Sequence, residues 1–206
     1  MSKNAIAHLG SDPVMSALIE KVGNLRLHPR RLPPFQSLAH AIIHQQLNSN
    51  AAGTILERFK GLFPDDSFPP PGQVAKASVD RLRTAGLSRP KAAYIIELAK
   101  RCEADLIPSV SDCDSLNDEE IMAKLTESKG IGSWTVEMFL IFNLGRPDVL
   151  PVHDLGVRRG FQIAHQKRTL PTPEQLGQYG LRWAPHRTLA ARYLWRAADS
   201  AENPNW

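Results

Sequence analysis

Apolar residues recur at a helical spacing along nearly the whole chain, and this spacing is the feature that most limits its fold. Side chains that return every three or four residues line one face of a helix. Such segments include 13–22, 90–102, 155–165, 173–183 and 186–198. No stretch of four or more residues alternates as a half-buried strand does, and the short apolar run at 149–152 contains a proline. The fold class expected from the sequence is therefore all-α.

Two helix starts are marked by side chains that can cap them. Asn117 precedes Glu120 at the spacing of a capping box, in which each side chain accepts a hydrogen bond from the other residue's backbone N–H. Thr172 stands before Pro173 and three residues before Gln175, a favourable order for the first turn of a helix. We therefore expect helices to begin directly after Asn117 and Thr172.

Composition narrows the class of protein. The 206 residues suit one domain or two small lobes, and 42% hydrophobic residues are enough for a packed core. The net charge of +4 fits a polyanionic partner without requiring one. No apolar run approaches the roughly 18 residues of a membrane span, and the N-terminus lacks the apolar stretch of a secretory signal. We expect a protein that is neither secreted nor membrane-bound.

Cys102 and Cys113 are the two cysteines of the chain. Their spacing is not that of a metal site, and two cysteines are too few for a disulfide framework. They also cannot supply the four thiolates of an iron–sulfur cluster. We expect reduced thiols and no iron–sulfur cluster.

The most informative segment is a glycine pair between two helical patterns. Gly130 and Gly132 flank Ile131, and glycine permits positive φ angles and close backbone approach. A helix that starts just after Gly132 directs backbone N–H groups and its positive dipole end outward, which suits an anion such as a phosphate. Lys129 adds a positive charge, and Ile131 is expected to fill the core of the hairpin. Taken alone, a glycine-rich turn that binds no ligand explains the pattern equally well.

This segment and the residues after it resemble the helix-hairpin-helix DNA glycosylase superfamily. The matching sequence is K-G-I-G-S-W-T-V-E-M-F at 129–139, followed by L-P-V-H-D-L-G at 150–156. Within the superfamily the chain is similar to the 3-methyladenine DNA glycosylase II (AlkA/MAG) branch. The similarity extends to A-I-I-H-Q-Q-L-N-S-N at 41–50, G-L-S-R-P-K-A at 86–92 and R-W-A-P-H-R-T-L-A-A-R-Y-L-W at 182–195.

The resemblance implies a two-lobed all-α fold with a cleft between the lobes. We expect a single glycosylase domain over 1–206. Its central lobes are expected at about 35–110 and 111–165, with the termini 1–34 and 166–206 packed on them, and the helix-hairpin-helix at about 117–143. The larger bacterial AlkA has an additional β-rich lobe, for which this chain has no room. The resemblance is therefore to the compact all-α form.

Asp154 matches the aspartate that heads the helix after the hairpin in this superfamily, and it lies 22 residues beyond Gly132. The resemblance implies that Asp154 is catalytic. Breaking an N-glycosidic bond leaves positive charge on the sugar. A fixed carboxylate can stabilise this charge, or it can orient a water molecule that attacks the sugar. By its position alone, Asp154 is better explained as the N-cap of a helix over 155–165. The two roles are compatible.

Four residues match positions of the damaged-base pocket, namely Trp134, Trp195, Met138 and His44. A base alkylated at a ring nitrogen is cationic, and an indole face attracts a cation by about 0.5–2 kcal/mol. Met138 stands where AlkA has a pocket tyrosine, so the preferred substrate can differ. The tryptophans and His44 could instead be core residues of their helices, which is the interpretation we adopt for Trp183.

Further matches concern contact with DNA. Leu47 falls at the position of the wedge that fills the gap left by a flipped base, although it could instead be a buried residue at a helix end. Gln46 and Asn48 could touch base edges or phosphates. His153 could contact a phosphate, tune Asp154, or be an ordinary loop histidine. The hairpin residues expected to hold DNA are Lys129, Gly130, Gly132, Ser133 and Thr135.

Trp134 stands where strand-cutting relatives carry a lysine that forms a Schiff base. The resemblance therefore implies a monofunctional enzyme that leaves an abasic site. The resemblance implies that the reaction requires no cofactor. The backbone carbonyls of Thr126, Lys129 and Ile131 match positions that hold Na⁺ or K⁺ in some relatives.

The implied function is excision of alkylated bases, such as 3-methyladenine and 7-methylguanine, from double-stranded DNA in base excision repair. The implied protein is a monomeric hydrolase of the DNA-3-methyladenine glycosylase II type, cytoplasmic (at the nucleoid) in a bacterium and nuclear in a eukaryote. Two alternatives stay open, a DNA-damage-binding hairpin protein without activity and a glycosylase for another lesion such as ethenoadenine or uracil. Asp154 separates the binder from the enzyme, because a pure binder needs no carboxylate beside a phosphate.

Overall fold

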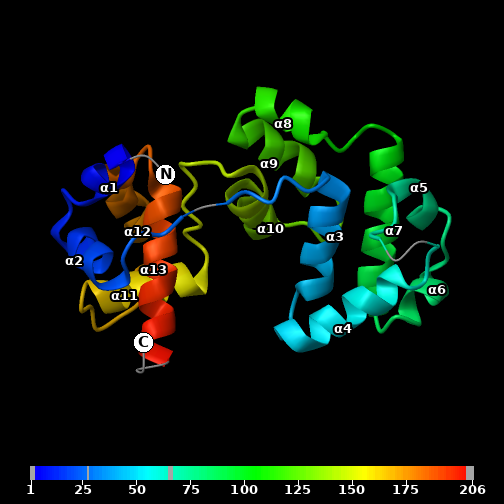
Figure 1. Ribbon diagram of the computed structural model, residues 1–206, viewed down its shortest axis with the longest axis horizontal. Helices are drawn as coiled ribbons and strands as arrows, with labels where there is room; N and C mark the ends of the chain where they lie inside the picture. Colours follow the sequence, from blue (N-terminus) through cyan, green and yellow to red (C-terminus); the bar gives the residue numbers. More distant parts are fainter. Residues whose placement is uncertain (1–2, 27, 65–66, 203–206) are drawn as a thin grey trace. The chain divides into compact units, whose positions relative to one another are not determined.

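The computed structural model describes residues 3–26, 28–64 and 67–202, and every regular element in these ranges is a helix (Figure 1). The α-helices are α1 Lys3–Leu9, α2 Pro13–Val22, α3 Pro34–His44, α4 Ser49–Lys60, α5 Pro71–Val74, α6 Val79–Arg83, α7 Arg89–Glu103, α8 Val110–Ser115, α9 Asp118–Thr126, α10 Ser133–Met138, α11 Leu155–Ala164, α12 Pro173–Gly180 and α13 Arg187–Glu202. A π-helix, η1 Phe139–Leu144, continues α10, and a 3₁₀-helix, η2 Leu181–Trp183, follows α12. The all-α expectation is confirmed. No helix within the described ranges is long and apolar enough to cross a membrane.

The chain folds into two compact units. The first unit joins residues 1–30 to residues 140–206, and the second unit is formed by residues 31–139. The sequence suggested central lobes at about 35–110 and 111–165 instead. The observed boundary lies at the start of η1, so the segment after residue 110 is shared between the units.

Specific contacts explain where this boundary falls. An ion pair of 2.6 Å joins Arg31 to Asp114, and another of 2.6 Å joins Arg101 to Glu127. These pairs attach the segment 111–139 to the helices that precede it. After the boundary, the ring of Phe142 stacks on Trp195 of α13 at a centroid distance of 5.7 Å. The chain beyond residue 139 therefore belongs with the C-terminal helix.

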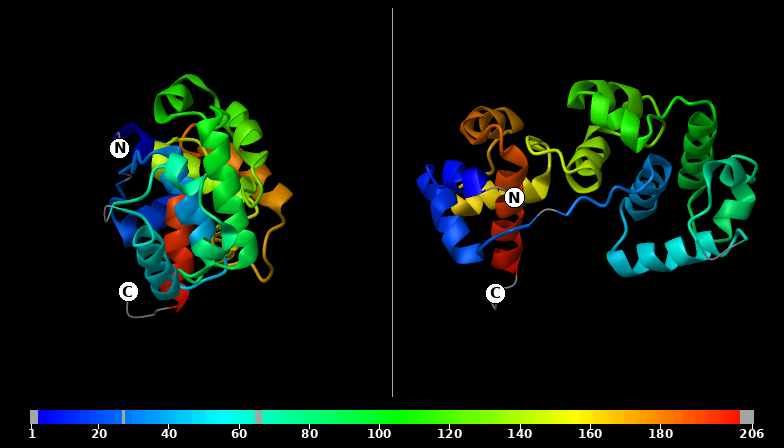
Figure 2. Two further views of the ribbon diagram at one scale, coloured as in Figure 1. Left: turned by 90° about the vertical axis from the view of Figure 1, so that its right-hand side faces the viewer. Right: turned by 45° about the horizontal axis from the view of Figure 1, so that its top comes forward.

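The first unit is built around the packing of α11 against α13 (Figures 1 and 2). The two helices approach so closely that a Cβ atom at Gly160 would overlap the backbone of Leu194. Around this contact, the large side chains of Phe161, Trp183 and Tyr193 are buried. Trp183 is thus a core residue, as the sequence analysis expected.

Asp12 is a buried carboxylate at the start of α2, with 6% of its surface exposed. It accepts hydrogen bonds from Val14 N at 2.9 Å, from the Tyr179 hydroxyl at 3.1 Å and from Trp183 Nε1 at 3.0 Å. Burial by itself would raise the pKa of Asp12, but these hydrogen bonds lower the pKa below its ordinary value. One charged group therefore joins α2 to α12 and η2 through fully paired polar contacts.

In the second unit, α3 packs against both α4 and α7 (Figures 1 and 2). Pro34 occupies the first position of α3, where a backbone N–H has no partner within the helix. The face of α3 that carries Leu38, Ile42 and Ile43 is completely buried. This face anchors α3, so that its C-terminal end, at His44, is held by well-packed neighbours.

Local side-chain signals predicted some helix starts and missed others. Asn117 with Glu120, and Thr172 with Gln175, both form the complete reciprocal capping box. The sequence analysis did not anticipate α1 or α8. Both are short, with 7 and 6 residues, and so carry at most two turns of apolar periodicity.

We predict that Asp12→Ala lowers the free energy of unfolding by roughly 2–3 kcal/mol at pH 7, because the buried indole of Trp183 and the half-buried hydroxyl of Tyr179 lose their acceptor. The pKa of Asp12 is lowered in the folded state, so its stabilisation is complete above the ordinary value of 3.8 and is lost as the pH falls below it. The loss of stability on acidification should therefore be shallower in Asp12→Asn. Urea unfolding between pH 3 and pH 7 measures both effects.

Glu20→Ala, on the exposed face of the same helix, is the matched control and should change stability by less than about 0.5 kcal/mol. Equal effects of the two alanine variants would show that the Asp12 network contributes nothing.

Candidate active site

Asp154 lies at the head of α11 in the first unit and caps that helix. Its Oδ1 accepts a hydrogen bond from Val157 N at 2.8 Å. The same oxygen accepts a second hydrogen bond, also 2.8 Å long, from the indole Nε1 of Trp195. These two hydrogen bonds hold the carboxylate in a defined orientation. Asp154 is half-buried, so it still has contact with solvent. The capping role expected from the sequence is confirmed, and it is compatible with a catalytic role.

Trp195 reaches Asp154 because its neighbours leave space for the indole. A Cβ atom at Gly156 would lie only 2.9 Å from Cδ1 of Trp195, so the glycine permits the close approach. The ring of Phe142 stacks on the ring of Trp195, with the ring planes inclined by 29°. Trp195 is half-buried. The sequence analysis considered a pocket or a core position for Trp195 and missed its hydrogen bond to the carboxylate.

The loop before Asp154 is fastened to the start of α13. Asp148 accepts two hydrogen bonds from the Arg187 guanidinium, each 2.9 Å long, and one from Arg187 N at 3.1 Å. The Thr188 hydroxyl donates to Arg146 O at 2.7 Å and accepts from Val149 N at 2.9 Å. Burial would raise the pKa of Asp148, but the bonds to Arg187 lower it overall. Sequence reasoning did not single out these residues, because they are distant along the chain.

Two exposed side chains flank the carboxylate. His153 precedes Asp154 and faces solvent. Leu155 follows it and is 61% exposed. Most of the surface of this leucine is left uncovered in this unit, so its apolar surface is available to a ligand.

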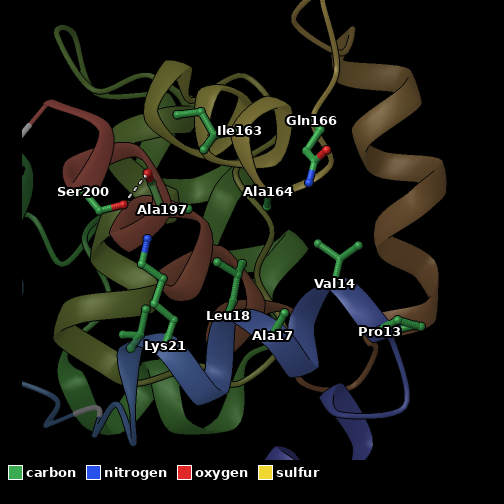
Figure 3. A pocket seen from close by; sticks show the side chains of 11 residues that line it. Pro13, Val14, Ala17, Leu18, Lys21, Ile163, Ala164, Gln166, Ala197 and Ser200 are labelled. Carbon is green, nitrogen blue, oxygen red and sulfur yellow. Dashed lines mark hydrogen bonds between the residues drawn. The ribbon is translucent and has the colours of Figure 1, made fainter. Parts of the chain in front are cut away.

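A cavity elsewhere in the first unit is separate from this site. It has a volume of about 520 Å³ and is lined largely by aliphatic side chains of α2, including Val14 and Leu18, and by Ile163 of α11 (Figure 3). Asp154 stands at the opposite end of α11, which at 10 residues is about 15 Å long. This cavity is therefore not the expected base pocket.

The hairpin joins α9 to α10 in the second unit. Gly130 has φ of +81°, and a Cβ atom there would collide with the ring of Tyr94. Ile131 is 4% exposed and fills the hairpin as expected. Gly132 is the N-cap of α10 and, having no side chain, makes no capping hydrogen bond. Lys129, Gly132 and Ser133 are exposed, so the start of α10 is open to a ligand.

Thr135 departs from the expectation for the hairpin. It was grouped with the DNA-contacting residues, but it is 3% exposed. It lies on the face of α10 that packs inward together with Val136, so its side chain supports the helix and does not point to solvent.

The α3–α4 connection carries the wedge candidate. Leu47 is 40% exposed, which excludes the alternative of a buried helix-end leucine. Gln46 is exposed, with φ of +57°. Asn48 uses its side-chain oxygen to accept from Ala51 N at 2.9 Å and thereby caps α4. His44 is exposed at the end of α3, so the core alternative for His44 is also excluded.

The remaining pocket candidates lie on α10. Trp134 is 45% exposed, which is far more than a core tryptophan shows. Met138, one turn later, is half-buried. Together with the α3–α4 connection, these residues belong to the second unit, whereas Asp154 and Trp195 belong to the first.

Comparison with known proteins agrees with this arrangement of elements. Residues 39–186 match the family described as HhH-GPD superfamily base excision DNA repair protein. The chain belongs to this superfamily. DNA-3-methyladenine glycosylase 1 of Schizosaccharomyces pombe is 35% identical over 98% of this chain and 90% of its own length.

Solved structures of the superfamily superpose closely on the chain. One is the S. pombe 3-methyladenine DNA glycosylase Mag1 in complex with abasic DNA, with a TM-score of 0.87, 35% identity and 99% of each chain covered. Another is a DNA-3-methyladenine glycosidase from Bacillus halodurans, with a TM-score of 0.88, 35% identity, and 98% of this chain and 92% of that chain covered. These matches cover both units, so the likeness is not limited to the hairpin.

Metal-binding side chains are not clustered in the part of the chain that the structure describes. Within the described ranges, no group of three or more His, Cys, Asp or Glu residues is placed to hold a metal ion. Cys102 and Cys113 form no disulfide. Burial raises the pKa of the Cys102 thiol to about 12, so this cysteine stays protonated and unreactive at neutral pH.

We predict that Gly130→Ala destabilises the protein by about 1–3 kcal/mol, because alanine is strained at this positive φ and its methyl group meets the Tyr94 ring. For a domain of this size, such a loss lowers the melting temperature by several degrees. Adding Tyr94→Ala should relieve the collision but not the backbone strain.

Gly132→Ala is the matched control, because φ at Gly132 is −95° and no atom lies within 4 Å of the position its Cβ would take. Thermal unfolding should show a loss below about 1 kcal/mol for this variant, because alanine is only a poorer N-cap than glycine and meets no strain or collision. If the two alanine variants were equally stable, the requirement for glycine at position 130 would be refuted.

Proposed function

We propose that this chain is a DNA-3-methyladenine glycosylase that hydrolyses the N-glycosidic bond of alkylated bases in DNA and leaves an abasic site. The observation that carries the proposal is the Asp154 carboxylate, held by Val157 N and Trp195 Nε1 at 2.8 Å each. The superfamily membership and the names of the similar glycosylases support the same activity.

Asp154 would act on the charge that develops during bond cleavage. The bond between C1′ of the deoxyribose and the base nitrogen breaks, and its electron pair leaves with the base. Positive charge then accumulates on the sugar, where a fixed carboxylate stabilises it. Water adds its oxygen to C1′ and loses a proton, which completes the abasic product. A base that is cationic through alkylation leaves as a neutral molecule and therefore needs little further activation.

The two donors to Oδ1 explain how the carboxylate keeps its position. One hydrogen bond comes from the backbone N–H of Val157 and the other from the indole N–H of Trp195, so two different helices hold the same oxygen. These bonds also restrict rotation of the carboxylate, so that charge stabilisation requires no reorganisation during the reaction. We infer that Trp195 orients Asp154, besides any contact of its ring with the base.

Trp134 supports a monofunctional reaction. It occupies the position of the Schiff-base lysine of strand-cutting relatives, and an indole has no amine that can attack C1′. With 45% of its surface exposed, its ring can stack on a flipped cationic base. Met138 and His44 would complete the surroundings of the base.

DNA is proposed to be held by residues of the second unit. The exposed backbone at Gly132 and Ser133 would bind a phosphate at the start of α10, with Lys129 beside it. Leu47 would enter the stack when the damaged base leaves it. Gln46 and Asn48 are exposed and would contact the flanking strand. His153, an exposed residue of the first unit, would contact it as well.

We propose that the hairpin holds a monovalent cation. The carbonyl oxygens of Thr126, Lys129 and Ile131 are neutral, hard ligands of the kind that suits Na⁺ or K⁺. In the same turn, the Ser128 hydroxyl is buried without a hydrogen-bond partner. When bound there, the ion would add positive charge beside a DNA phosphate. The monomeric state, and action wherever chromosomal DNA lies, are part of the same proposal.

We predict that Asp154→Asn lowers the single-turnover rate of base release from methylated duplex DNA by at least about 100-fold. Asparagine retains an oxygen that can accept from Val157 N and Trp195 Nε1, so the fold and DNA affinity should be preserved. Chromatography of released 3-methyladenine and 7-methylguanine, with binding measured by fluorescence anisotropy, tests this. Asp199→Asn, an exposed carboxylate of α13, should behave as wild type.

Equal base release by wild type and Asp154→Asn would refute the catalytic role of Asp154. Intact DNA binding without release of any alkylated base by wild type would favour a protein that only binds damage.

We also predict that borohydride traps no covalent adduct between the wild-type protein and damaged DNA, because Trp134 replaces the lysine that forms the Schiff base in strand-cutting relatives. The DNA strand should stay intact until the abasic product is cleaved by hot alkali. A strand-cutting glycosylase of the same superfamily serves as the positive control. A trapped adduct would contradict the monofunctional reaction.

A further inference from the structure

The wedge candidate Leu47 is presented by a strained turn. Leu47 N donates to His44 O at 3.2 Å, with Gln45 at φ −53° and ψ 130° and Gln46 at φ +57°. These angles follow the pattern of a type II turn, whose third residue is normally glycine or asparagine. A glutamine there is held in a sparsely populated conformation, which persists only when the surroundings enforce it.

Lys91 is the first residue that holds the turn in this conformation. From the first turn of α7, its Nζ donates to Ile43 O at 2.9 Å and to Gln45 O at 2.5 Å. These carbonyls belong to the end of α3 and to the turn itself. An ammonium group at a helix C-terminus pairs with the partial negative charge of the last carbonyls. The Lys91 side chain is thus hydrogen-bonded to the backbone immediately before Gln46.

Gln45 is the second such residue, and it joins the turn to the hairpin. Its side-chain Nε2 donates to Gly130 O at 2.9 Å. The hairpin is in turn packed on the ring of Tyr94, which lies on α7 one turn beyond Lys91. The turn that presents Leu47 and the glycine hairpin are therefore both fastened to α7 and to each other.

We propose that Lys91 is a positioning residue for base flipping, which holds the Leu47 turn in register with the hairpin. The inference rests on the proposed function, because it assumes that Leu47 enters the DNA stack. A wedge must be in place when the base leaves, and a small displacement of a positioned group is costly in rate. The Lys91 and Gln45 contacts keep the distance between wedge and phosphate site constant without contacting DNA.

A purely structural cap on α3 would have different consequences. Loss of stability affects all substrates equally, whereas loss of wedge position matters most where the damaged base is firmly paired. Flipping costs less from a mismatch than from a regular pair. The dependence of the defect on base pairing therefore separates the two roles.

The test compares Lys91→Met with wild type on two duplexes that contain 7-methylguanine, opposite cytosine and opposite thymine. Single-turnover base release should fall by at least about tenfold for the cytosine duplex and by less than about threefold for the thymine duplex. Lys91→Arg, which retains a cationic donor, should recover most of the loss. Lys100→Met, which removes an exposed lysine from the same helix, should match wild type.

Gln45→Met provides a second variant should Lys91→Met fail to fold, and it should show the same dependence on base pairing. Equal losses on both duplexes, or no loss on either, in variants that unfold at the wild-type temperature would overturn the inference.

A binding measurement keeps the inference distinct from the glycosylase proposal. A duplex with 2-aminopurine beside a non-cleavable abasic analogue changes fluorescence when a wedge enters the stack. The change should be reduced in Lys91→Met at saturating protein. If wild type releases no methylated base, the proposed function fails, but this signal still decides the role of Lys91, and an unchanged signal in the variant would overturn it.

Discussion

The first unit depends on one shared acceptor, Oδ1 of Asp154. This oxygen accepts a hydrogen bond from Val157 N at the start of α11 and a second hydrogen bond from the indole N–H of Trp195 on α13. Because a single oxygen serves both donors, the start of α11 cannot shift without breaking the contact with α13. The group proposed to act on the sugar is thus also the group that locks two central helices together.

Close helix packing makes this contact possible. Gly160 lets the α11 backbone meet that of α13, and Gly156 admits the Trp195 ring. The preceding loop is held by the bidentate pair of Asp148 with Arg187. The position of the carboxylate is therefore determined by backbone proximity and by two separate polar contacts, which is the rigid support that a preorganised anion requires.

In the second unit, the candidate DNA-contacting groups are exposed side chains that have to be kept in fixed positions. Leu47 and Trp134 are large apolar residues with 40% and 45% of their surface exposed. Each leaves a large part of its apolar surface in water, so burial alone does not fix its position and neighbouring contacts are needed. Lys91 provides this support by its hydrogen bond to Gln45 O in the turn before Leu47. The hairpin before Trp134 is supported by the hydrogen bond from Gln45 to Gly130 O and by the packing of Gly130 on Tyr94 of α7.

The helical period, the capping residues and the hairpin glycines were sufficient to predict the fold class, and the resemblance singled out Asp154 as the candidate carboxylate. These are local properties, since periodicity, capping and φ preference act over a few residues. What tertiary structure alone decided was the bond from Trp195 to Asp154, the burial of Thr135, the hold of Lys91 on the Leu47 turn, and the division of the chain at residue 139. Each joins positions far apart in sequence, where spacing carries no information about which donor meets which acceptor.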